Sequence, residues 1–144
     1  MRGDMPEIKK ISHVALVVED IDNALEFWRD GLGIPLDHIS QVPDEQSAVA
    51  FLPVGDSEIE LVQPVSDDSG IAKFMAKRGP GMHHICLEVD NLEGFLADLM
   101  DKGIQLINES PNVGEGGRKY AFIHPKAANG VLVELYELPV VDSE

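Results

Sequence analysis

Residues 83–104, HHICLEVDNLEGFLADLMDKGI, decide the fold because they repeat an earlier part of the chain. Residues 12–34, SHVALVVEDIDNALEFWRDGLGI, show the same order: a histidine, an alternating apolar stretch, an acidic or amide cluster, and an amphipathic helical pattern that ends at glycine. The repeat continues downstream, where EIELVQP (58–64) matches VLVELYELP (131–139). A match at both ends of each half indicates an internal duplication.

Each half is predicted to run strand, helix, then three further strands, from the period of its apolar residues and its turn signals. In the first half the strands are expected at 11–18, 36–42, 47–53 and 58–63, and the helix, capped by Asp20, at 21–30. In the second half the strands are expected at 84–89, 105–108, 119–124 and 130–137, with a helix from an Asp90–Glu93 capping pattern to about residue 102. A short helix is expected at 71–77.

The predicted fold class is α+β, with two βαβββ modules paired into a curved sheet around a cleft. A lone module would expose a sheet face and an edge, and pairing two modules buries both. We expect a single domain, 1–144, with the repeats at 8–65 and 82–138 and a helical connector at 66–81.

Composition excludes several classes of protein. The chain has 11 Lys and Arg against 26 Asp and Glu, a net charge of −15, which argues against nucleic acid as the main partner. No apolar run approaches the ~20 residues of a membrane span. The N-terminal MRGDMPEIKK lacks the apolar core of a signal peptide, and the lone Cys86 excludes an internal disulfide. We therefore expect a cytoplasmic protein with no membrane partner.

The duplication singles out four polar residues on strands. Successive strand residues alternate between the two faces of a sheet. This alternation places His13, Glu60, His84 and Glu134 on equivalent, concave faces. Each residue alone would more often have a structural role, but two imidazoles and two carboxylates recurring at matched positions indicate a divalent metal site. His83 points the other way and is not expected to be a ligand.

Two further residues have less decisive patterns. Cys86 shares the face of His84, but cysteine is commonly a small buried hydrophobe, and no zinc-finger spacing surrounds it. His124 lies in the turn-like segment HPKAANG, where it is either a loop residue or a contact to the ligand.

The chain resembles the vicinal oxygen chelate superfamily, which includes glyoxalase I and the extradiol dioxygenases. Within it, the chain looks like the methylmalonyl-CoA epimerase family from about Ile8 to Glu137. The resemblance rests on ISHVALVVEDIDNALEFWRDGLGI, on the central block FLPVGDSEIELVQPVSDDSGIAKFMAKRGPGMHHICLEVDN, and on GGRKYAFIHPK and GVLVELYE. It implies the vicinal oxygen chelate fold and often a homodimer.

The resemblance also implies a divalent metal held by His13, Glu60, His84 and Glu134, with Co²⁺ or Mn²⁺ ahead of Zn²⁺, Ni²⁺ or Mg²⁺. The implied reaction interconverts (2R)- and (2S)-methylmalonyl-CoA by proton abstraction and return at C2, through a metal-stabilised enolate. The implied first base is Glu134.

Inversion at C2 needs a second acid or base on the opposite face of the substrate. Some bacterial family members have a glutamate near the position of Ala50, but SAVAFLPV carries no carboxylate. Glu60, a water or Glu45 is left for this role. Contacts to the phosphates or carboxylate of an acyl-CoA substrate are expected from Lys126, Arg118 and Lys73.

Three other functions stay open at this point. A glyoxalase I-like isomerase would use the same four ligand positions. A ring-cleaving iron dioxygenase fits less well because it uses two histidines and one carboxylate with open positions. A metal-free binding member of the superfamily would lack the ligand set.

Overall fold

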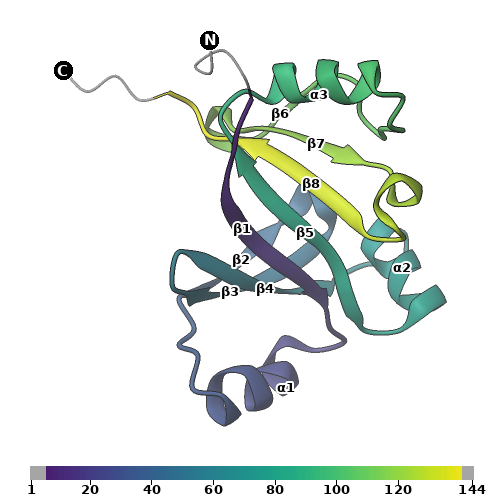
Figure 1. Cartoon of the computed structure of the whole chain (residues 1–144). Helices are drawn as coiled ribbons and strands as arrows, with labels where there is room; N and C mark the ends of the chain where they lie inside the picture. Colours follow the sequence, from purple (N-terminus) through teal and green to yellow (C-terminus); the bar gives the residue numbers. More distant parts are fainter. Residues whose placement is uncertain (1–5, 141–144) are drawn as a thin grey trace. The chain divides into compact units, whose positions relative to one another are not determined.

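The computed structural model describes residues 6–140, and the chain divides into two compact units (Figure 1). One unit comprises residues 13–83, and the other comprises residues 6–12 together with 84–140. The segment MRGDM, part of the stretch in which no signal peptide is expected, lies outside the described residues. Within them, no helix has both the length and the apolar character that a membrane crossing requires.

The unit of residues 13–83 has the predicted order of elements. Its strands pair in the order β2-β3-β4-β1, with β1 parallel to β4 and the other neighbours antiparallel. The elements are β1 (Ile8–Val17, from residue 13), α1 (Ile21–Leu25), the π-helical turn η2 (Glu26–Gly31), β2 (His38–Val42), the short η3 (Pro43–Glu45), β3 (Ser47–Val54), β4 (Ser57–Pro64) and α2 (Gly70–Arg78).

The two faces of this sheet separate as predicted. On one face, α1 buries Ile21 and Leu25 against Leu52 and Leu61. On the other face, Ala15 of β1 packs with Val49 and Val62. This second face is the one that also carries His13.

The first helix differs from its prediction beyond Leu25. Asp20 caps it as expected, accepting a hydrogen bond from Asn23 N at 2.9 Å. From Glu26 to Gly31 the chain winds more widely, and Leu32 N donates to Phe27 O, five residues back, at 2.8 Å. The period of apolar residues could not distinguish this π-helical turn from continued α-helix.

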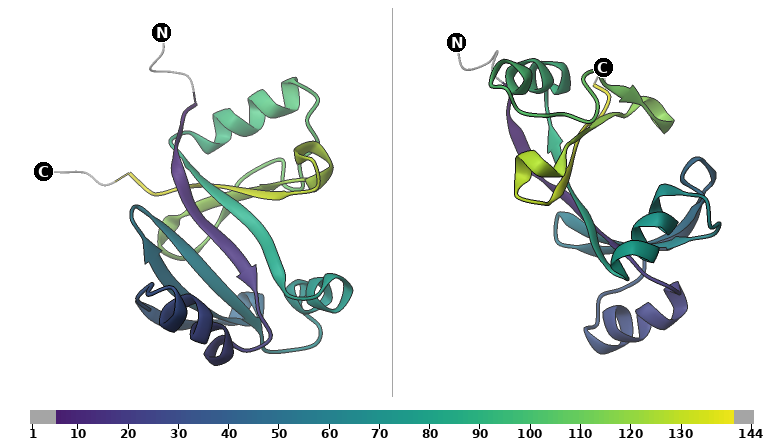
Figure 2. Two further views of the ribbon diagram at one scale, coloured as in Figure 1. Left: turned by 60° about the horizontal axis from the view of Figure 1, so that its bottom comes forward. Right: turned by 90° about the vertical axis from the view of Figure 1, so that its right-hand side faces the viewer.

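The second unit repeats this topology, with strands in the order β5-β8-β7-β6 and β5 parallel to β8. Its helix α3 covers one face of these strands (Figure 2). The helix buries Leu92 and Leu96 against Val89, Ala121 and Leu135. The elements are β5 (Gly81–Val89, from residue 84), α3 (Leu92–Asp101), β6 (Asn112–Val113), the short η4 (Glu115–Gly117), β7 (Lys119–Ile123), the short η5 (Pro125–Ala128) and β8 (Leu132–Glu137).

The prediction of a strand at 105–108 is wrong. Only a single bridge joins Leu106 to Ile123, and the outer strand of this unit is the short β6. The side chain of Asn108 accepts a hydrogen bond from Phe122 N at 2.9 Å, in place of the backbone acceptor that a continuing strand would supply.

The capping pattern predicted for α3 is also wrong by one residue. Asn91, not Asp90, is the N-cap, and its Oδ1 accepts from Gly94 N at 3.0 Å. Asp90 Oδ1 instead accepts from Glu7 N at 2.9 Å. Gly94 is explained by the cap, since a Cβ there would lie 2.6 Å from Asn91 Nδ2.

Candidate functional site

A histidine and a glutamate form a close pair in the unit of residues 13–83. His13 Nδ1 on β1 lies 3.4 Å from Glu60 Oε2 on β4, and their side chains are only 10% and 16% exposed. The parallel register of the two strands places Glu58 opposite His13 and Glu60 opposite Ala15. Glu60 is therefore two residues along from direct opposition, on the same face as His13.

The other unit contains the corresponding pair. His84 Nε2 on β5 lies 3.1 Å from Glu134 Oε1 on β8, with side chains 12% and 9% exposed. The register here places Leu132 opposite His84 and Glu134 opposite Cys86, so the offset of two residues is the same. Within each half, the structure thus brings together the two residues that the repeat singled out.

The chemistry of each pair fits a divalent metal. An imidazole nitrogen and a carboxylate oxygen are ligands of divalent transition metals, and both side chains of each pair are largely shielded from water. Burying a carboxylate without compensating positive charge is costly, and a bound dication would provide that charge.

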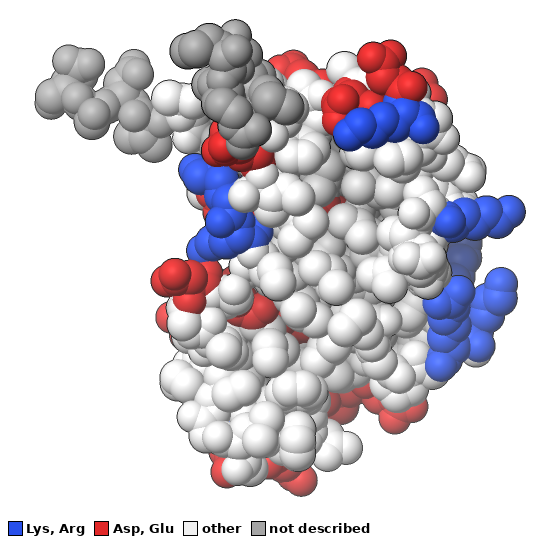
Figure 3. Space-filling model, in the orientation of Figure 1, with Lys and Arg blue, Asp and Glu red and all other residues white. Residues whose placement is uncertain are grey.

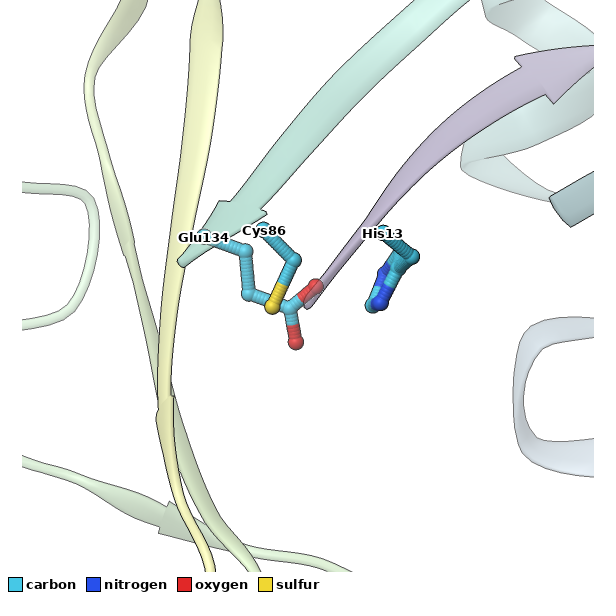
Figure 4. A group of neighbouring side chains, drawn as sticks. All are labelled: His13, Cys86 and Glu134. Atoms are coloured by element: carbon cyan, nitrogen blue, oxygen red, sulfur yellow. The ribbon is translucent and has the colours of Figure 1, made fainter. Parts of the chain in front are cut away.

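Cys86 is a neighbour of Glu134 that the sequence left undecided. It is fully buried, and its Sγ lies within 4.8 Å of a Glu134 ligand atom. Figure 4 shows the two side chains on neighbouring strands, Cys86 from β5 and Glu134 from β8, with His13 drawn on β1. The thiol adds a third donor type beside the histidine–glutamate pair of this unit.

The other two histidines that the sequence considered have local roles. The ring of His83 packs edge-on against Phe74 of α2, with centroids 4.8 Å apart. His124 Nδ1 accepts from Lys126 N at 3.0 Å and caps the turn at η5. This contact supports the loop interpretation of His124.

Strand β3 offers no carboxylate for the second acid or base. Ala50 lies in the core against α1, whereas Val49 packs with Ala15 on the face that carries His13. Phe51 is the register partner of Glu60. The positions of β3 nearest the His13–Glu60 pair are therefore apolar.

The three predicted substrate-binding cations differ in their surroundings. Lys73 on α2 and Lys126 at η5 are exposed. Arg118 is half-buried, and its guanidinium carbon lies 5.7 Å from the ring centroid of Tyr120 and 5.6 Å from that of Tyr136. On the face drawn in Figure 3, lysines and arginines form separate groups and no continuous basic surface.

The aromatic neighbours of the second pair were missed from sequence. Phe122 packs edge-on against His84, with centroids 5.8 Å apart, and Tyr136 follows Glu134 by two residues. Burial raises the pKa of Tyr136 above its ordinary value, partly opposed by a hydrogen bond from Ser12. Strand alternation predicts Tyr136 on the face of Glu134, but it does not reveal the aromatic residues of β7 beside that face.

Comparisons with known proteins agree with this architecture. Residues 12–122 match the family described as the Glyoxalase/Bleomycin resistance protein/Dioxygenase superfamily. A mitochondrial methylmalonyl-CoA epimerase of Mus musculus is 37% identical over 130 residues, which cover 90% of this chain and 73% of that protein.

Solved structures give the same result. A methylmalonyl-CoA epimerase from Mycobacterium tuberculosis has a TM-score of 0.82 at 36% identity, covering 92% of this chain and 90% of that one. A methylmalonyl-CoA epimerase in complex with methylmalonyl-CoA and NH4+ has a TM-score of 0.81 at 30% identity, covering 96% of this chain and 100% of that one.

The fold is that of a glyoxalase-type protein. The chain belongs to the Glyoxalase/Bleomycin resistance protein/Dioxygenase superfamily and, within it, to the methylmalonyl-CoA epimerase family.

Proposed function

We infer that this protein is a methylmalonyl-CoA epimerase that interconverts the 2R and 2S forms of its substrate. The observation that carries this inference is the buried histidine–glutamate pair that recurs in both halves of a chain from this family. The related structure with methylmalonyl-CoA bound supports an acyl-CoA substrate.

We propose that His13, Glu60, His84 and Glu134 together bind one divalent metal ion, with Co²⁺ or Mn²⁺ first among the candidates. The proposal is supported by the shared offset of the two pairs and by their mixed nitrogen and oxygen donors. When bound, the dication would supply positive charge to the enolate that forms on loss of the C2 proton.

Glu134 is the proposed first base. The C2 proton is acidic because it lies between a thioester carbonyl and a carboxylate, so a carboxylate base can remove it when the enolate charge is stabilised. The Glu134 side chain is only 9% exposed, which keeps bulk water from competing for the proton.

The second acid or base is proposed to be Glu60. Inversion requires that the proton return on the face opposite to its removal. The β3 residues near Glu60 are the apolar Val49 and Phe51, which cannot transfer a proton. The carboxylate of Glu60 is therefore the proposed acid–base group on this part of the sheet. Glu45, in the short η3, is exposed.

We also propose that the protein is cytoplasmic, that it forms a homodimer, and that it has no nucleic acid or membrane partner. The single cysteine and the acidic composition support the compartment and the absence of nucleic acid. The family resemblance supports the dimer.

The activity is tested by supplying one epimer of methylmalonyl-CoA to metal-loaded protein and following the appearance of the other. Methylglyoxal with glutathione serves as the comparison substrate, because a glyoxalase I-like enzyme would isomerise the thiohemiacetal that they form. Epimerisation with no turnover of the thiohemiacetal supports the proposal, whereas the reverse result supports the isomerase. Binding of metal-free protein to a small molecule without turnover would indicate the binding class.

A further inference from the structure

The guanidinium of Arg118 lies over two tyrosine rings. Its central carbon lies 5.6 Å from the centroid of Tyr136 on β8 and 5.7 Å from that of Tyr120 on β7. The two tyrosines are direct register partners on antiparallel strands. A planar cation stacked on aromatic rings is fixed in orientation and keeps its N–H groups available at its edge.

The surrounding backbone holds this arrangement. Gly114 N donates to Arg118 O at 2.7 Å, closing the turn between β6 and β7. A Cβ on Gly114 would lie 3.3 Å from Tyr120 and 3.6 Å from Arg118 Nη2, so glycine allows the close approach. Tyr136 also makes a side-chain hydrogen bond with Ser12.

One donor of this arginine is left unused by the protein. Among the described residues, Arg118 Nε is buried and has no hydrogen-bond partner. A buried N–H without an acceptor costs free energy, and a carboxylate can accept from Nε and a neighbouring Nη at once. A planar anion at the edge of this guanidinium would give Nε the acceptor that the protein does not supply.

The location of Arg118 relative to Glu134 indicates which anion Arg118 would bind. Tyr136 is two residues beyond Glu134 on the same face of β8, a distance of about 7 Å along the strand. On the next strand, Tyr120 lies opposite Tyr136 and Phe122 lies opposite Glu134. The guanidinium therefore lies over the Tyr120–Tyr136 pair, which is two residues along β8 from the proposed base Glu134.

The nearby carboxylates have other partners. Glu88, the register partner of Tyr136, lies 3.6 Å from Lys9. Glu137 accepts from Leu92 N at 2.8 Å and is committed to the start of α3.

We propose that Arg118 binds the free carboxylate of the acyl group and thereby selects malonyl-type thioesters over simple acyl thioesters. This carboxylate is bonded to C2, the carbon from which Glu134 is proposed to take the proton. The phosphates of CoA, in contrast, are separated from C2 by the whole pantetheine arm. The inference rests on the proposed epimerase function and specifies how its substrate is recognised.

The test measures binding of methylmalonyl-CoA, propionyl-CoA and CoA to the metal-loaded full chain by calorimetry. Propionyl-CoA lacks only the carboxylate. Arg118→Ala should lower the affinity for methylmalonyl-CoA about 10- to 100-fold and leave the affinities for propionyl-CoA and CoA unchanged. Arg118→Lys, which keeps a cation on the rings but loses the bidentate fork, should give an intermediate loss.

Arg78→Ala is the matched control, because Arg78 is also stacked on an aromatic ring, 5.6 Å from the centroid of Phe74. It should leave the ratio of methylmalonyl-CoA to propionyl-CoA affinity unchanged. In epimerisation, Arg118→Ala should raise KM for methylmalonyl-CoA. Thermal melting of each variant shows whether it is folded.

Two results would overturn the inference. An equal loss for all three ligands would place Arg118 on the CoA phosphates or in a structural role, and unchanged binding of methylmalonyl-CoA would remove it from the site. Failure of the epimerase proposal is distinguished by the wild-type protein, which in that case would not interconvert the epimers at all.

Discussion

His84 Nε2 lies 3.1 Å from Glu134 Oε1, and the parallel register of β5 and β8 holds the glutamate two residues along from direct opposition. His13 and Glu60 have the same relationship on β1 and β4, at 3.4 Å. A shared offset means that both halves direct an imidazole and a carboxylate to the same side of a parallel strand pair. The two pairs therefore have equivalent geometry, each within its own unit.

Replacing His84 should remove a metal ligand, whereas replacing its neighbour should not. Loss of a residue that only hydrogen-bonds to a metal ligand lowers metal affinity by about 10- to 100-fold. Because His84 is proposed to bind the metal directly, we expect His84→Ala to lower the affinity at least as much. His83→Ala is the matched control, because the His83 ring packs on Phe74. Metal content after dialysis at defined free Co²⁺ measures both. Equal metal content in the two variants would exclude His84 as a ligand.

Glu134→Gln should remove the proposed base while keeping the size of the side chain and an oxygen atom that can bind a metal. The expected decrease in epimerisation is about 10²- to 10⁴-fold, the contribution of a positioned acid or base. Steady-state rates with each epimer, together with metal content, measure it. Near-normal turnover with metal bound would contradict the assignment of Glu134 as base.

Cys86→Ala tests whether the buried thiol contributes to the site. We expect the variant to bind one metal ion and to epimerise at close to the wild-type rate, with a loss of about 1 kcal/mol in unfolding free energy from the buried position. Metal titration and urea denaturation measure the two effects. Loss of metal binding in a variant that remains folded would instead make Cys86 a ligand alongside Glu134.

The cap of α3 gives a prediction about stability. Asn91→Ala should cost about 1 kcal/mol, because the Asn91 side chain accepts from Gly94 N. Gly94→Ala alone should change stability little, since its gain in helix propensity of about 1 kcal/mol is offset by displacement of the cap. In the Asn91→Ala background the same substitution should stabilise the protein. Urea denaturation of the two single variants and the double variant measures these effects. If the changes in unfolding free energy of the single variants simply add up in the double variant, the explanation of Gly94 is wrong.

The duplication made much of this structure predictable. Two copies of one pattern predicted the order of elements along the chain. They also placed His13, Glu60, His84 and Glu134 on equivalent faces, because alternation along strands depends only on local sequence. The outer strand was misplaced because an Asn108 side chain replaces a backbone acceptor, which no periodicity reveals. The stacking of Arg118 was missed for a related reason, since it depends on the long-range register of Tyr120 with Tyr136.

The central claim is metal-dependent proton exchange at C2, and deuterium incorporation tests it most directly. Metal-loaded protein is incubated in D₂O with a single epimer of methylmalonyl-CoA, and the C2 position is followed by NMR and mass spectrometry. We predict that deuterium enters C2 as the stereochemical purity is lost, that chelation stops both, and that added Co²⁺ restores them. Metal-replete protein that leaves the C2 proton unexchanged would contradict the account.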